Sequence, residues 1–204
     1  MLRVYLARHG RTEWNVQGRV QGGGPLDAAG RAQAEALARR LRGEPIDAVY
    51  ASPTPRARQT ARPVAKARGI IVHQSRYLVD LDYGKYGSMH KDDAVRDDPA
   101  LWERWRVAPH TVVFPGGEGL AALRLRLLTW LEAMHGKWPG GTLFAATHDS
   151  PIRTVVTIAR GLDDSHHHDE GLRAVNGALT LIEVDGHDIR LIAHNDTSHL
   201  PGGD

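Results

Sequence analysis

Two arginines and two histidines carry the strongest chemical signal in this sequence: Arg8, His9, Arg56 and His148. Arginine presents a planar fork of N–H donors that matches the oxygen atoms of a phosphate or a carboxylate. A neutral imidazole can attack phosphorus, and a protonated imidazole can stabilise negative charge. If the fold brings the four side chains together, they predict an anion site at which a phosphoryl group could be transferred.

The elements around these residues predict that they converge. Apolar alternation and buried apolar runs predict strands over residues 3–7, 48–52 and 142–147. Arg8 and His9 follow the first strand, Arg56 lies in the first turn of the helix after the second, and His148 follows the third. Ligands of parallel sheets bind at the carboxyl ends of the strands, so we expect the four side chains to share one sheet edge.

Helices are predicted between these strands. The expected segments follow Asp27 up to residue 42, begin at Thr54-Pro55, carry an apolar stripe over 120–134, and begin at Ser150-Pro151. Pro63 should kink the second helix or end it early. A weak strand over 70–73 and a hairpin of 178–184 with 188–194 complete the pattern. The predicted fold class is α/β, a three-layer, mostly parallel sheet with helices on both faces and an antiparallel edge strand.

Length and composition narrow the class of protein. The 204 residues predict one domain, 1–204, with a cap-like insertion around 82–115 that contains one short helix near 99–106. The net charge of +2 gives no indication of nucleic-acid binding, and no apolar run predicts a membrane span. The absence of cysteine excludes disulfides and thiolate ligands within this sequence. With no secretory signal at residues 1–10, we expect a cytoplasmic protein.

Five segments, in order, resemble one known family. They read LARHGRTEWN at 6–15, SPTPRARQTA at 52–61, PGGE at 115–118, HDSPIR at 148–153 and NDTSHL at 195–200. They are similar to segments of the histidine phosphatase superfamily, in its phosphoglycerate-mutase-like branch. The resemblance covers nearly the whole chain and implies the fold of that branch.

The resemblance also implies roles for individual residues. His9 would be the nucleophile that forms a phosphohistidine, while Arg8, Arg56 and His148 would hold the phosphoryl oxygens. Asn15 and Gln21 would line the same pocket. No metal or other cofactor is expected, because cationic side chains would do the work that Mg²⁺ does in other phosphoryl-transfer enzymes.

The proton donor is the point at which this sequence departs from the family. The family usually places a glutamate where this chain has Asp80, one methylene shorter. Asp82 should share a strand face with Asp80, and Asp149 follows His148 as in the acid-phosphatase and phytase branch. We rank Asp80 first, Asp149 second and Asp82 third. The alternative for Asp149 is a carboxylate that only stabilises a helix N-terminus.

The predicted function is a metal-independent phosphatase of small phosphomonoester metabolites, acting through His9. The alternatives are a cofactor-dependent phosphoglycerate mutase and a noncatalytic anion-binding sensor. The expected partner is the small phosphorylated substrate, whose identity the sequence does not give, and relatives of this kind are often homodimers.

Two further clusters call for an interpretation. His166, His167 and His168 are consecutive and favour an exposed loop, with pocket lining as the second interpretation. Cationic residues in and beside the insertion could together form a wall suited to an acidic substrate, whereas for any single one of them a solvated charged surface is the favoured interpretation. They are Arg76, Lys85, His90, Lys91, Arg104 and Arg106.

Overall fold

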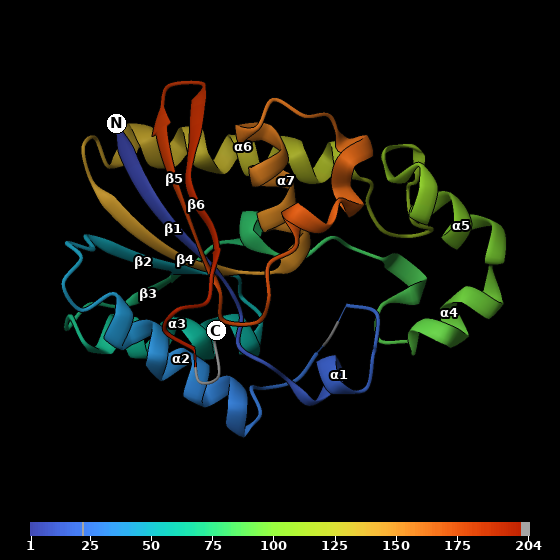
Figure 1. Cartoon of the computed structure of the whole chain (residues 1–204), viewed down its shortest axis with the longest axis horizontal. Helices are drawn as coiled ribbons and strands as arrows, with labels where there is room; N and C mark the ends of the chain where they lie inside the picture. Colours follow the sequence, from blue (N-terminus) through green and yellow to red (C-terminus); the bar gives the residue numbers. More distant parts are fainter. Residues whose placement is uncertain (22, 201–204) are drawn as a thin grey trace.

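One six-stranded sheet organises the chain. The computed structural model describes residues 1–21 and 23–200. The strands are β1 (Leu2–Arg8), β2 (Ala48–Ala51), β3 (Val72–Gln74), β4 (Thr142–Thr147), β5 (Leu179–Asp185) and β6 (Asp188–Asp196). Their order is β3-β2-β4-β1-β5-β6, with β1 to β4 parallel and β5 and β6 antiparallel (Figure 1). The predicted fold class is therefore confirmed, including the antiparallel hairpin at one edge.

Helices cover both faces of this sheet. The α-helices within the described residues are α1 (Glu13–Val16), α2 (Ala28–Arg40), α3 (Pro55–Lys66), α4 (Lys91–Asp97), α5 (Pro99–Val107), α6 (Leu120–Lys137) and α7 (Asp149–Ala159). Short 3-10 helices are η1 (Arg76–Leu78), η2 (Gly84–Tyr86), η3 (Pro109–Thr111), η4 (Asp164–His168) and η5 (Glu170–Leu172). The pair α2 and α3 packs on one face, and α6 and α7 pack on the other.

Strand β1 shows how the sequence builds two apolar layers from one strand. Val4 and Leu6 are buried in the layer beneath α6 and α7, whereas Tyr5 and Ala7 are buried in the layer beneath α2 and α3. Successive side chains of a strand point to opposite faces, so a strand apolar at every position must be covered on both sides. The end of such a strand, with Arg8 and His9, is fixed in position by both layers.

Two helix predictions need correction. Pro63 does not end α3 early, because the helix continues to Lys66, and the buried Ala61, Val64 and Ala65 hold its apolar face in the core on both sides of the proline. Helix α7 begins at Asp149 with His148 as the N-cap residue, two residues before the predicted cap. Pro151 is compatible with this start, since N–H groups in the first turn of a helix have no intrahelical acceptor.

The stretch over 82–115 is more regular than predicted, with two α-helices, α4 and α5, in place of one. Both lie to the side of the sheet (Figure 1), and α5 contacts η4 through Trp105 and His168. The indoles of Trp102 and Trp105 anchor α5 in an aromatic cluster with Phe114. The single-domain boundary at 1–204 stays a prediction. Within the described residues, no helix combines the length and the apolar character that a membrane crossing requires.

Candidate active site

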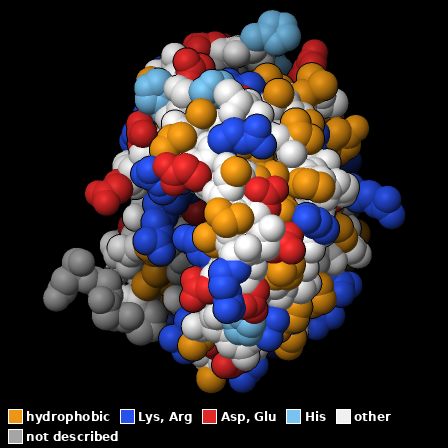
Figure 2. Space-filling model, turned by 90° about the vertical axis from the view of Figure 1, so that its right-hand side faces the viewer, with side chains coloured by type: hydrophobic (Ala, Val, Ile, Leu, Met, Phe, Trp, Pro, Cys, Tyr) orange, Lys and Arg blue, Asp and Glu red, His pale blue; other side chains and the backbone are white. Residues whose placement is uncertain are grey.

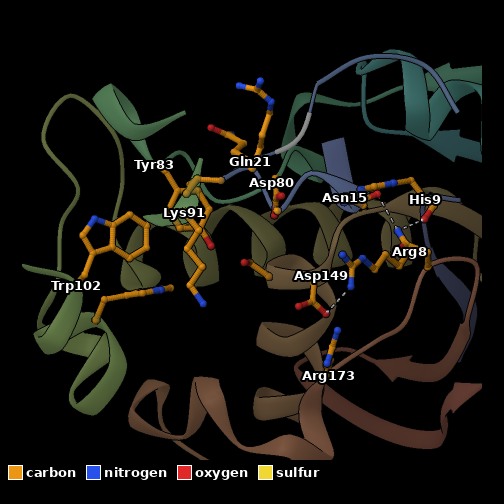
Figure 3. Close-up of a pocket in the computed structure, with 16 residues that line it drawn as sticks. Arg8, His9, Asn15, Gln21, Asp80, Tyr83, Lys91, Trp102, Asp149 and Arg173 are labelled. Carbon is orange, nitrogen blue, oxygen red and sulfur yellow. Dashed lines mark hydrogen bonds and ion pairs between the residues drawn. The ribbon is translucent and has the colours of Figure 1, made fainter. Parts of the chain in front are cut away.

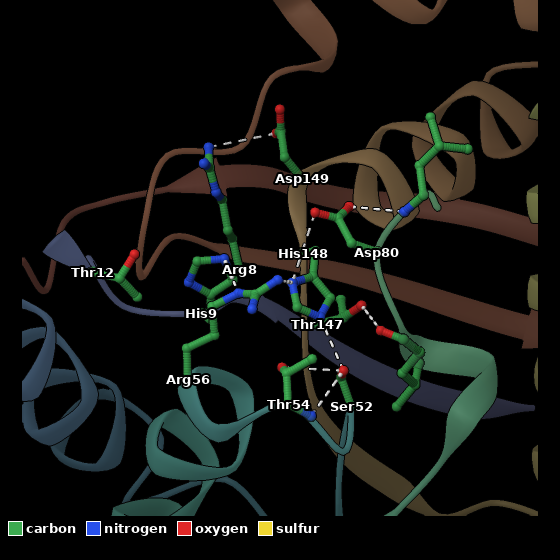
Figure 4. Close-up of polar contacts among 12 residues, drawn as sticks. Arg8, His9, Thr12, Ser52, Thr54, Arg56, Asp80, Thr147, His148 and Asp149 are labelled. Atoms are coloured by element: carbon green, nitrogen blue, oxygen red, sulfur yellow. Dashed lines mark hydrogen bonds and ion pairs between the residues drawn. The ribbon is translucent and has the colours of Figure 1, made fainter. Parts of the chain in front are cut away.

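Arg56 is the centre of a buried polar cluster at the carboxyl ends of β1 and β4. Its Nε donates to Nε2 of His9 at 3.1 Å, and its Nη2 donates to Nδ1 of His148 at 3.1 Å (Figure 4). The two imidazole rings lie 5.1 Å apart, edge to face. Arg8 enters the same cluster from the last residue of β1. The structure thus brings together the four residues that the strand pattern placed at one sheet edge.

Close backbone packing fixes the position of His9. The N–H of Gly10 donates to Oγ1 of Thr60 at 2.9 Å, which ties the end of β1 to α3. A Cβ atom on Gly10 would lie 2.5 Å from the carbonyl oxygen of Gly30 in α2. Only glycine fits between β1 and α2 at this point, so the residue after His9 has a structural reason to be glycine.

The hydrogen bonds of His9 define its tautomer. A guanidinium can only donate, so Nε2 of His9 accepts from Arg56 and carries a lone pair. The opposite nitrogen, Nδ1, therefore bears the proton and donates to the carbonyl oxygen of Gly10 at 2.8 Å. Burial, together with the charges of Arg56 and Arg8, holds the pKa of His9 well below its usual value. The ring is neutral, with its nucleophilic nitrogen directed into the cluster.

His148 is oriented by the same reasoning. Its Nδ1 accepts from Arg56, so its Nε2 bears the proton and donates to Oγ of Ser52 at 3.0 Å. Burial and the neighbouring Arg56 lower the pKa of His148 well below its usual value. A bound phosphoryl dianion would oppose this shift and favour a protonated His148. The ring is placed to respond to an anion in the cluster.

Asp80 is the carboxyl group nearest to these rings. Its Oδ2 lies 3.9 Å from Nδ1 of His148, and its Oδ1 accepts from the N–H of Leu81 at 3.0 Å. Burial raises the pKa of Asp80 to about 6, although the charges of Arg56 and Arg8 oppose the shift. A carboxyl group with such a pKa can hold a proton and release it near neutral pH, which a general acid must do.

Asp149 has the opposite electrostatic character. Burial alone would raise its pKa, but the charges of Arg8 and Arg153 outweigh burial and bring the pKa below the usual value. Arg153 Nε donates to Oδ2 of Asp149 at 2.9 Å, and the N–H of Ala174 donates to Oδ1 at 3.0 Å. Asp149 is an ionised, fully paired carboxylate at the first residue of α7, which favours the structural interpretation of this residue.

Asp82 does not share a face with Asp80, because no strand forms there. Its side chain is exposed, and its Oδ1 accepts from the N–H of Gly84 at 2.9 Å in a turn. Of the three carboxylates considered as the proton donor, Asp82 is the one outside the cavity lining.

A cavity of about 450 Å³ opens in front of the cluster (Figure 3). Arg8, His9 and Asp80 lie on its wall, and so do Asn15 and Gln21, the two residues expected to line it. Lysine and arginine side chains flank a hollow on the face that carries α4 and α5 (Figure 2). The cavity is therefore lined by cations and open to solvent.

A loop just before β5 supplies site residues that sequence reasoning missed. Nδ2 of Asn176 donates to the carbonyl oxygen of His9 at 2.9 Å, and the carbonyl oxygen of Ala174 accepts from Arg8 Nη1 at 2.7 Å. Arg173 and Asn176 line the cavity. The predicted antiparallel hairpin could have indicated this loop. A strand that runs antiparallel to β1 begins beside the end of β1, so the residues before that strand lie close to His9.

The C-terminal segment holds this loop in place. Oδ1 of Asn195 accepts from the N–H of Val175 at 2.9 Å, and Nε2 of His199 donates to the carbonyl oxygen of Gly177 at 3.0 Å. The segment NDTSHL thus contacts the loop whose backbone binds Arg8. Sequence analysis gave this segment no chemical role.

Two expectations about the surroundings of the site need correction. Among the predicted wall cations, Lys91 lines the cavity, whereas Lys85 pairs with Asp97 at 2.8 Å outside it. His167 is buried against Trp105, so an exposed loop is wrong for that residue. His168 is exposed, and its Nε2 donates to the carbonyl oxygen of Trp105 at 2.8 Å.

Comparisons with known proteins agree with this geometry. The family profile described as histidine phosphatase superfamily (branch 1) matches residues 4–197. Phosphoserine phosphatase 1 of Hydrogenobacter thermophilus is 30% identical over 202 residues, 98% of this chain and 95% of that protein. A probable phosphoglycerate mutase, GpmB, of Enterobacter sp. is 38% identical over 165 residues, 79% of this chain and 76% of that protein. The solved structure of YhfR from Bacillus stearothermophilus is 28% identical, with a TM-score of 0.93 over 98% of this chain and 100% of that chain.

Proposed function

We propose that this chain hydrolyses small phosphomonoesters through a phosphohistidine on His9. The premise is that the chain belongs to branch 1 of the histidine phosphatase superfamily and is an enzyme of the phosphatase type. The observation that carries this proposal is the contact of Arg56 with both imidazoles. It directs the lone pair of His9 Nε2 to the place where guanidinium groups would hold phosphoryl oxygens.

In the first step, Nε2 of His9 attacks phosphorus, and the bond between phosphorus and the ester oxygen breaks. The neutral carboxyl group of Asp80 gives its proton to the departing oxygen, so that the alcohol leaves uncharged. Arg8, Arg56 and a protonated His148 stabilise the charge on the three equatorial oxygens in the transition state.

In the second step, a water molecule attacks the phosphohistidine from the side that the alcohol has left. The Asp80 carboxylate takes the proton of this water, and the bond between phosphorus and Nε2 breaks. Inorganic phosphate leaves, and both His9 and Asp80 return to their starting protonation states. The same carboxyl group therefore serves as acid and then as base. No resident cofactor enters either step.

A phosphoglycerate mutase is the second candidate, favoured by the name of the Enterobacter relative. A mutase would use the same phosphohistidine and return the phosphoryl group to a second hydroxyl of the substrate. An assay primed with bisphosphoglycerate separates the two, because sustained conversion without free phosphate would favour the mutase. The complete cluster of Arg8, His9, Arg56 and His148 argues against a noncatalytic sensor. A homodimer and a cytoplasmic location stay predictions.

The experiment that tests the proposal is phosphate release from a panel of phosphomonoesters, with EDTA present, by the wild type and by His9→Ala. We expect turnover by the wild type that EDTA leaves unchanged and that His9→Ala loses. Turnover retained by His9→Ala would refute the role of His9. No release by either protein, with conversion in the mutase assay, would favour the second candidate.

A further inference from the structure

A second cavity, of about 550 Å³, adjoins the first along α4 and α5. The two cavities share three wall residues, Lys91, Trp102 and Trp105. Beyond them the second cavity continues between Val95 of α4 and Pro99 of α5. A molecule that reaches from His9 toward solvent on this side therefore passes from the first cavity into the second.

The two cavities differ in chemistry. The first is lined by charged and amide side chains that suit a phosphoryl group. The second presents indole, valine and proline carbon over most of its wall. Lys91 and His168 also line it, and Glu103 and Arg106 pair with each other at 2.6 Å. An ion pair already satisfied has little left to offer a charged ligand. The second cavity favours an apolar group.

The apolar walls are preformed. Trp102 and Trp105 are 8% and 6% exposed, and their ring centroids lie 5.6 Å and 5.1 Å from that of Phe114. The hydrogen bond of His168 to the carbonyl oxygen of Trp105 joins α5 to η4 on the far side. A rigid apolar wall binds a ligand without the cost of ordering its own side chains.

We infer that the second cavity is a leaving-group subsite, which binds an apolar chain or ring on the alcohol of the phosphomonoester while the phosphate lies at His9. This inference rests on the proposed phosphatase activity and adds the class of substrate: a phosphate ester of a bulky, apolar alcohol. The volume of the second cavity supports a bulky alcohol as its occupant. A compact polar alcohol fits within the first cavity and leaves the second unused, whereas pockets of several hundred Å³ suit ligands of considerable size.

The test uses primary alkyl phosphates from ethyl to hexyl, because the acidity of the leaving alcohol is nearly constant along this series. Each CH2 group that enters the second cavity should raise kcat/KM about fourfold. We expect hexyl phosphate to exceed ethyl phosphate by at least about tenfold in kcat/KM. A flat series would overturn the subsite, whereas no hydrolysis of any ester would refute the phosphatase proposal instead.

A variant of Val95 tests whether the dependence of kcat/KM on alkyl chain length arises in the second cavity. Val95→Asp places a carboxylate in the second cavity, away from the catalytic cluster, and should reduce the hexyl-to-ethyl ratio toward one while leaving ethyl phosphate turnover unchanged. Val107→Asp is the matched control, because Val107 is an exposed valine at the end of α5 outside the cavity. A ratio that Val95→Asp leaves unchanged would overturn the assignment.

A second measurement, of inhibition constants on the wild type, does not depend on whether a variant folds. Hexylphosphonate and ethylphosphonate cannot be hydrolysed, so their inhibition constants report binding alone. Hexylphosphonate should inhibit at least about tenfold more strongly, by the same gain per CH2 group. Equal inhibition constants would contradict the subsite.

Discussion

The two ends of the active-site cavity are built in different ways. At the phosphoryl end, His9, Arg56 and His148 are 3%, 3% and 0% exposed, and each is held by hydrogen bonds at the edge of a doubly covered sheet. At the leaving-group end, the wall comes from α4 and α5, where the exposed Lys91 lies beside the indoles of Trp102 and Trp105. The comparison teaches that the core of the fold fixes the positions of the charged residues, whereas peripheral segments form the wall that we propose binds the leaving group.

The largest effect should come from breaking the phosphoryl end. Arg56→Ala removes the group that contacts both imidazoles and should lower kcat for every phosphomonoester by about a thousandfold. Arg58→Ala, an exposed arginine two residues later on α3, is the matched control and should stay within twofold of the wild type. A loss of less than tenfold in Arg56→Ala would show that the cluster is not the catalytic centre.

Asp80 lies at the border between the two ends, so the loss of turnover caused by replacing it should depend on the leaving group. Asp80→Asn should slow an alkyl phosphate by about a hundredfold or more, because the alcohol needs a proton to leave. It should slow p-nitrophenyl phosphate far less, since that leaving group departs as a stable anion. Asp82→Asn, with its side chain in an exposed turn, is the control. Equal losses on both esters would contradict the assignment of Asp80 as the acid.

The pH dependence of turnover also tests whether Asp80 is the acid. Because burial raises the pKa of Asp80 to about 6, the protonated acid is lost as the pH rises past that value. Turnover of an alkyl phosphate should fall on this alkaline limb, which begins near or above pH 6 because a bound dianion raises the pKa further. Asp80→Asn should remove the limb from the pH profile. If the alkaline limb is unchanged in Asp80→Asn, the titration of another group must cause it.

The raised pKa of Asp80 also affects stability, with a sign fixed by linkage. The folded state holds this proton more tightly than the unfolded chain, so the contribution of Asp80 to stability declines as the pH rises from about 4 to about 6. Urea unfolding should show a smaller decline over this window in Asp80→Asn than in the wild type. An identical pH dependence in the two proteins would count against a raised pKa.

The smallest effect should come from the support of the phosphoryl end. Asn195→Gly keeps the left-handed backbone, φ 54°, but loses the oxygen that accepts from Val175. We expect a drop of about fivefold in kcat with little change in KM, because the loop that binds Arg8 loosens. Asn195→Asp keeps that oxygen and should restore kcat, and Ser198→Ala should behave as the wild type. A loss that Asn195→Asp does not restore would contradict this explanation.

Sequence reasoning reached the phosphoryl end because strand ends obey a topological rule. Arg8, His9, Arg56 and His148 follow directly from where β1, β2 and β4 stop, and burial on both faces makes such strands recognisable. The leaving-group end follows no comparable rule. The burial of His167 depends on Trp105, sixty-two residues earlier in the chain. Such contacts between distant segments leave no periodic pattern in the sequence.

The most direct test of the account is to trap the covalent intermediate. The wild type and His9→Ala would be mixed with a phosphomonoester, quenched in base within one turnover, and analysed by mass spectrometry of intact protein and peptides. The account predicts one added phosphoryl group, stable in base and labile in acid, on the peptide that contains His9, and none in His9→Ala. A phosphoryl group on another residue, or rapid turnover by His9→Ala, would contradict it.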